Sequence, residues 1–159
     1  MDKRTAINDF FYERIRLSAE NNPEKTALID SEGNKAGYAD VLHAYDAMRD
    51  FLMETGIMPW ERFAFSTEDI MALAMLQLPV LENAVISHID SKLPEKAVES
   101  RMDLINHDYV VTDDLESTVS RKALEKGLGI ILFKRTGRKG NICYSFDLYR
   151  EPDGSPRGR

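Results

Sequence analysis

The stretch AVISHIDSKLPEKAVESRMDLINHDYVVT, residues 84–112, decides the expected fold of this chain. It begins with the nearly continuous apolar run Ala84–Ile89 and ends with a second apolar run, Tyr109–Thr112. Between these runs, Pro94 suits the first turn of a helix that continues to about Asn106 with apolar residues at helical spacing. A strand, a helix and a second buried strand in this order predict parallel strands joined by a helical crossover.

The same alternation of strands and helices extends in both directions from this stretch. Further buried strands are expected at Arg62–Ser66 and Gly129–Phe133, and a final alternating strand at Ile142–Tyr149. The expected helices span about residues 8–21, 40–54 and 115–126, with another between a capping box at Ser66–Asp69 and Pro79. The fold class is therefore α/β, a mostly parallel sheet flanked by helices on both faces. A small β-hairpin near residues 26–38 should lie outside this sheet or at its edge.

Length and composition limit the possible functions. The chain has 159 residues, so one domain is expected over residues 1–150, followed by a Gly/Pro-rich tail at 151–159 that should be disordered or a linker. A formal net charge of −6 disfavours binding to nucleic acids or anionic membranes. No apolar run reaches the ~20 residues of a membrane span. The single cysteine, Cys143, excludes an intramolecular disulfide, and without a recognisable signal sequence this favours the cytoplasm.

Short motifs between residues 23 and 113 follow one another in an order that resembles the N-terminus of the adenylate-forming superfamily, which includes acyl-CoA synthetases and amino-acid adenylation domains. The matching segments are Pro23–Ala27, Gly37–Val41, Gly56–Ala64, Glu82–Asp90, Leu93–Lys96 and Val110–Asp113. There are departures, since Trp60 and Glu61 replace a glycine and an aspartate of the family pattern, and His88 replaces a proline. Six motifs in the correct order and spacing make coincidence an inadequate explanation.

The resemblance implies that the chain is the N-terminal fragment of an ATP-dependent acid ligase. The parent enzyme would form an acyl- or aminoacyl-adenylate and transfer it to a thiol, either CoA or the phosphopantetheine of a carrier protein. ATP and Mg are implied for that parent. The family's loops that bind them come later than Arg159, where this sequence stops, so no catalytic, cofactor-binding or metal residue is assigned and the chain alone is expected to be inactive. The implied partner is the remainder of the synthetase.

A different hypothesis keeps the same fold. The chain could be a free-standing, degenerate α/β module that binds a synthetase as a protein-interaction partner. Under the first hypothesis, a sheet that belongs inside a larger domain should expose an apolar face or an open edge. Homodimerisation is therefore expected, through the strand Ile142–Tyr149 or a face beside it.

Several residues resemble candidate sites in the sequence, and a structural role is favoured for each. The turn Thr136–Gly140 is the only stretch that resembles a phosphate loop, but it joins two expected strands and no helix follows it. His88 and Asp90 share a strand face, yet no nucleophile is evident nearby. The remaining residues are His43 and His107, which lack metal-ligand spacing, and Cys143 and Trp60, which are expected to be packed in the core.

Overall fold

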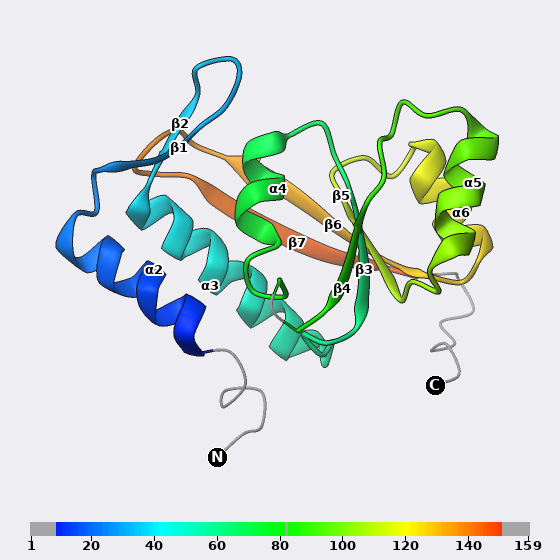
Figure 1. Ribbon diagram of the computed structural model, residues 1–159, viewed down its shortest axis with the longest axis horizontal. Helices are drawn as coiled ribbons and strands as arrows, with labels where there is room; N and C mark the ends of the chain where they lie inside the picture. The colour runs from blue at the N-terminus through cyan, green and yellow to red at the C-terminus, as the bar shows by residue number, and fades with distance from the viewer. Residues whose placement is uncertain (1–8, 82, 151–159) are drawn as a thin grey trace. The chain divides into compact units, whose positions relative to one another are not determined.

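The computed structural model describes residues 9–81 and 83–150 (Figure 1). The tail expected at 151–159 lies outside the described residues. The chain divides into two compact units, which are described separately below. The first contains the residues up to Trp60 together with Asp69–Asn83 and Lys134–Ser145, and the second contains Glu61–Glu68, Ala84–Phe133 and the chain from Phe146.

The first unit is built on two packed helices and a hairpin. Helix α2 (Asp9–Asn21) lies along α3 (Tyr38–Thr55), where the rings of Tyr12 and Tyr45 are 5.3 Å apart (Figure 1). The guanidinium of Arg49 stacks 4.3 Å above the Tyr12 ring. Strands β1 (Thr26–Ile29) and β2 (Lys35–Gly37) form an antiparallel pair of their own, which confirms the expected hairpin outside the main sheet. The short helix α4 (Ile70–Leu76) also belongs to the first unit.

The second unit carries the parallel strands. The main sheet has the order β4-β3-β5-β6-β7, with β3 (Arg62–Ser66), β4 (Val85–His88), β5 (Tyr109–Thr112) and β6 (Gly129–Thr136) all parallel. Strand β7 (Cys143–Tyr149) follows β6 after a short turn, a connection that joins antiparallel neighbours. Both β6 and β7 contribute residues to each unit. The expected α/β class with a mostly parallel sheet is confirmed.

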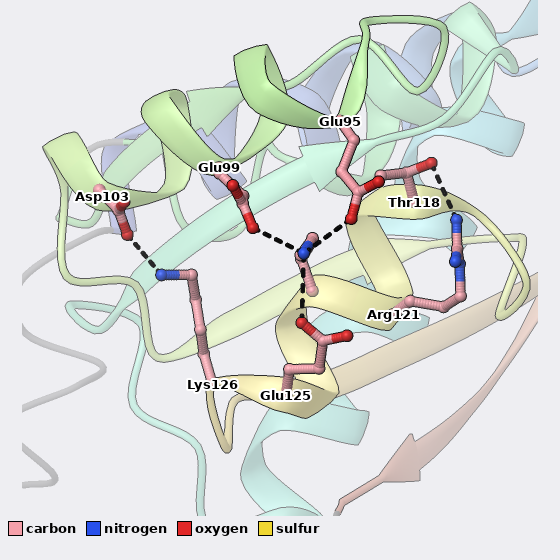
Figure 2. Close-up of polar contacts among 8 residues, drawn as sticks. Glu95, Glu99, Asp103, Thr118, Arg121, Glu125 and Lys126 are labelled. Atoms are coloured by element: carbon pink, nitrogen blue, oxygen red, sulfur yellow. Dashed lines mark hydrogen bonds and ion pairs between the residues drawn. The ribbon is translucent and has the colours of Figure 1, made fainter.

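Helices α5 (Glu95–Leu104) and α6 (Thr118–Glu125) pack against each other in the second unit. Their apolar sides meet the sheet in one core, which contains Ala64, Ile89, Val98, Met102, Val110, Val119, Ala123, Leu128 and Ile130. On the outer side, Lys122 Nζ lies 2.8 Å from Glu95, 2.6 Å from Glu99 and 3.3 Å from Glu125. The dashed lines in Figure 2 join these three labelled glutamates to one central nitrogen. Lys126 pairs in the same way with Asp103 of α5. The two helices are thus joined by both apolar packing and charge.

The ends of several helices differ from the sequence expectation. Helix α4 is capped by Asp69, whose Oδ1 accepts a hydrogen bond of 3.0 Å from the Ala72 amide, and not by a box beginning at Ser66. Ser66 instead ends β3. Helix α6 begins three residues later than expected, because the Ser117 hydroxyl caps it by accepting from the Ser120 amide. Local side-chain caps therefore decide where these helices begin.

Candidate functional sites

A buried carboxylate in the first unit holds the turn between β6 and β7. Asp40, in the first turn of α3, is fully buried. Its Oδ2 accepts hydrogen bonds from the backbone amides of Gly37, at 2.8 Å, and Gly140, at 2.7 Å. Its Oδ1 accepts a third from the Ile142 amide, at 3.2 Å. Because buried charges must be hydrogen-bonded to be tolerated, this carboxylate fixes the turn in place.

The turn fixed by Asp40 forms one wall of a basic pocket of about 510 Å³ within the first unit. Lys35 contributes from β2, and Arg135, Arg138 and Lys139 from β6 and its turn. Two of these cations are already engaged: Arg135 Nε lies 2.9 Å from Asp69 Oδ2, and Lys139 Nζ donates to Thr26 Oγ1 at 3.0 Å. The turn is therefore a hairpin connection with charged sides, as expected, and no helix begins between it and Arg150, the last described residue.

Two features of this region follow from its packing. Tyr144 in β7 is buried, and burial raises the pKa of its hydroxyl, with the nearby Asp69 carboxylate acting in the same direction. In the β1–β2 turn, hydrogen bonds from the side chain and backbone of Asn34 lower the pKa of Asp30. The Asp30 contacts hold the β1–β2 turn, whose residues Gly33 and Asn34 line the basic pocket.

The contacts of the three histidines do not assemble a catalytic or metal-binding group among the described residues. His88 is exposed on the edge strand β4, with its ring edge-on to Phe65, and Asp90 accepts a hydrogen bond from the Lys92 amide. The structure therefore gives the two members of the suggested His88–Asp90 pair separate partners. His43 is exposed on α3. His107 is buried and its Nε2 lies 2.9 Å from Ser87 Oγ.

Two expectations about core residues are wrong. Cys143 was expected to be packed, but it is exposed, because Ile142 and Tyr144 take the inward positions of this alternating segment. Trp60 was expected to fill the core where α3 gives way to β3, but it is 46% exposed. The buried residues of that connection are Ile57 and Glu61.

A polar pocket in the second unit was missed by the sequence analysis. It measures about 200 Å³ and is lined by Ser66, Thr67, Glu68, Ser91, Thr112, Asp113, Asp114 and Ser117. We call it the carboxyl-edge pocket, because its residues lie at or shortly after the carboxyl ends of β3, β4 and β5. The signal that could have found it is the occurrence of Ser, Thr and acidic residues directly after two parallel strands.

A third pocket, of about 330 Å³, lies in the first unit and is mostly apolar. Its lining includes Phe11, Ile15, Leu28, Val41 and Leu78. Within residues 9–81 and 83–150, no group of three or more His, Cys, Asp or Glu side chains is placed to hold a metal ion. No helix in these same ranges is long and apolar enough to cross a membrane.

Comparison with solved structures identifies the fold. The N-terminal subdomain of Klebsiella oxytoca NpsA, in space group P21, is 17% identical, with 86% of this chain and 40% of that chain covered and a TM-score of 0.57. VinN is 16% identical, with 76% and 30% covered and a TM-score of 0.61. Mycobacterium tuberculosis fatty acyl CoA synthetase is 17% identical, with 77% and 24% covered and a TM-score of 0.57.

The chain thus spans two fifths or less of the length of these solved chains. At this level of identity the likeness shows the fold, which is that of the N-terminal part of adenylation domains and acyl-CoA synthetases, as the sequence motifs indicated. No protein-family pattern matches the chain, and no curated protein matches it.

Proposed function

We propose that this chain is the N-terminal framework of an adenylate-forming acid ligase. The parent enzyme would use ATP and Mg to convert a carboxylic or amino acid to its adenylate and pass the acyl group to a thiol. The observation that carries this proposal is the fold likeness to an isolated N-terminal subdomain of such a protein over 86% of this chain. The remainder of the synthetase is the proposed partner, and the single cysteine suits a reducing cytoplasm.

Contacts within each unit support a framework role for the sequence motifs. The segment Pro23–Ala27 is bonded to Gly37–Val41, because the Tyr38 amide donates to the Lys25 carbonyl and the Ala39 amide donates to the Pro23 carbonyl, each at 3.1 Å. A side chain at Gly37 would lie 2.9 Å from the Pro23 carbonyl oxygen, so the glycine is required for this close approach.

A second framework contact joins two parallel strands at their amino ends. In the second unit, the Arg62 amide donates to Asp108 Oδ2 at 3.0 Å, and the Arg62 guanidinium donates to the Asn106 carbonyl at 3.1 Å. Arg62 belongs to the motif Gly56–Ala64, and the residues it holds lead directly into β5. The motifs therefore act by aligning strands, which is why none of their residues is assigned a role in chemistry.

The proposal can be tested by exchange with a known protein. A chimera in which this chain replaces the matching part of K. oxytoca NpsA should fold and release pyrophosphate with an acid substrate. The 159-residue chain alone should give no binding heat with Mg-ATP, because it is proposed to lack the groups that position and neutralise a triphosphate. A chimera that folds, as judged by circular dichroism, but releases no pyrophosphate would count against the framework role. Micromolar binding of Mg-ATP to the isolated chain would count against its inactivity.

Exposed apolar residues on the edges of the sheet favour a second candidate function, a protein-interaction module. Strands β4 and β7 form the two edges, and Val85 and Tyr149 on them are 46% and 42% exposed. Open edges of this kind promote pairing with another chain. We propose a homodimer formed through β7. Sedimentation equilibrium should then show a concentration-dependent dimer, and Tyr149→Lys should shift it to monomer. A monomer at every concentration would refute the homodimer.

A further inference from the structure

We propose that the carboxyl-edge pocket binds a small primary ammonium compound. The pocket is lined by Ser66, Thr67, Glu68, Ser91, Thr112, Asp113, Asp114 and Ser117, all within the second unit. This site is separate from the framework role proposed above, and it holds or fails independently of that role.

The carboxyl-edge pocket lies where the strand order of the sheet changes direction. Strands β3 and β5 are parallel neighbours, paired from Phe63 with Tyr109 to Ser66 with Thr112. From the carboxyl end of β3 the chain goes to β4 on one side, and from the carboxyl end of β5 it goes to β6 on the other side. Two neighbouring loops that leave a sheet in opposite directions open a crevice between them, and open α/β sheets bind their ligands at such crevices. The carboxyl-edge pocket lies at this point.

One hydroxyl in the lining of the pocket, that of Ser66, has no hydrogen-bond partner among the described residues. Ser66 is the last residue of β3, lines the pocket and is only 2% exposed. Its Oγ has no hydrogen-bond partner among the residues that the structure describes. Buried polar groups are normally hydrogen-bonded, since leaving one unpaired is unfavourable. A polar ligand in the pocket would satisfy this hydroxyl.

The side chains that line the pocket carry hydroxyl and carboxylate oxygens. Thr67 Oγ1 donates to Asp113 Oδ1 at 2.9 Å, and this bond links the loops after β3 and β5. Asp114 Oδ1 accepts from the Glu116 amide at 2.9 Å. A carboxylate accepts hydrogen bonds at both of its oxygens, so each aspartate also offers Oδ2 as an acceptor for a ligand.

These acceptors select the class of ligand. Glu68 adds a third carboxylate, and it forms an ion pair with Lys92, whose Nζ lies 3.5 Å from Glu68 Oε1. The negative lining disfavours phosphates and other anions. No metal-binding group is found in the described part of the chain, whereas a primary ammonium supplies three N–H donors for hydroxyl and carboxylate acceptors. The volume of about 200 Å³ is below that of sites for drug-sized ligands, so the ligand has few heavy atoms.

The experiment is a titration of the isotope-labelled full chain with propylammonium chloride, followed by amide chemical shifts at constant ionic strength. Saturable shifts are expected at residues 66–68 and 112–114. Tetramethylammonium has the same charge but no N–H donor, and it should give no saturable shifts there. Asp113→Asn should weaken propylammonium binding roughly tenfold, because it removes the charge but keeps the oxygen that accepts from Thr67. Asp103→Asn, outside the pocket in the same unit, is the matched control and should leave binding unchanged.

Ser66→Ala gives an independent readout. It should weaken propylammonium binding about fivefold without lowering the melting temperature, because the lost hydroxyl has no partner in the unliganded protein. The proposal is overturned if propylammonium gives no saturable shifts, if tetramethylammonium shifts the same amides equally, or if Asp103→Asn weakens binding as much as Asp113→Asn. Tighter binding of Mg²⁺ at the same amides would also overturn it, in favour of a metal site.

Discussion

Replacing the buried Asp40 carboxylate should strongly destabilise the protein. In Asp40→Asn, the one remaining oxygen can still accept from the Gly37 and Gly140 amides, which share Oδ2 in the native protein. The new amide group then faces the Ile142 amide, which donates to Oδ1 at 3.2 Å in the native protein. One charge-assisted hydrogen bond is replaced by a contact between two donors.

The expected loss follows from general values for such bonds. A hydrogen bond to a charged group contributes about 1.5–3 kcal/mol, and a buried donor without an acceptor costs about 1–3 kcal/mol. We therefore expect Asp40→Asn to lower the free energy of unfolding by about 2–3 kcal/mol, and Asp40→Ala, which strands all three amides, by about 3–5 kcal/mol. These are large fractions of the ~5–15 kcal/mol by which domains are stable.

The assay is urea unfolding followed by circular dichroism, with Asp50→Asn as the matched control. Asp50 is exposed on the same helix, so its substitution makes the same change in charge and should alter stability by less than about 0.5 kcal/mol. Hydrogen exchange at the Gly140 and Ile142 amides should accelerate in Asp40→Asn but not in Asp50→Asn. If Asp40→Asn and Asp50→Asn unfold at the same urea concentration, the reasoning is refuted.

Further predictions concern one turn and two titrating groups. Gly137→Ala should lower stability by about 2–3 kcal/mol in urea unfolding, since Gly137 has a φ of 87° and an added Cβ would lie 1.9 Å from the Asn141 carbonyl oxygen; unchanged stability would contradict this geometry. The hydrogen bond from Lys122 lowers the pKa of Glu95 below its usual value near 4.5, so the stability it contributes is present above that value and is lost as pH falls through the folded pKa. Lys122→Met should flatten the melting temperature's dependence on acid pH, while Lys96→Met should not. The raised pKa of Tyr144 means that stability should fall as pH rises above about 10, where the unfolded state ionises first. Tyr144→Phe should reduce this alkaline loss, and an identical alkaline profile would show that Tyr144 is not its cause.

The sequence predicted the parallel strands well because each contains a short run of mostly β-branched or aromatic apolar residues, too short for a helix. It predicted helix starts less well, because the run Ser66–Asp69 offers more than one side chain able to cap a helix, and only the packed structure selects Asp69. The exposed Cys143 was open to prediction, since its neighbours Ile142 and Tyr144 are the larger apolar residues of an alternating segment. The contacts of Asp40 could not be predicted, because nothing local in the sequence links a helix start to a turn 100 residues later.

The large sequence separation between Asp40 and its partners also affects folding during synthesis on the ribosome. The partners of Asp40 are 100 and 102 residues further along the chain, and the first unit takes its last segment from Lys134–Ser145. A ribosome therefore releases α2, α3 and the hairpin long before the segment that completes their unit. Contacts of such high sequence separation slow folding, because a long loop must close before they form. During synthesis, α2 and α3 would therefore lack their last packing partner, and the Asp40 carboxylate would be hydrated. Once the β6–β7 turn is synthesised, its backbone amides can replace water as the hydrogen-bond donors to Asp40.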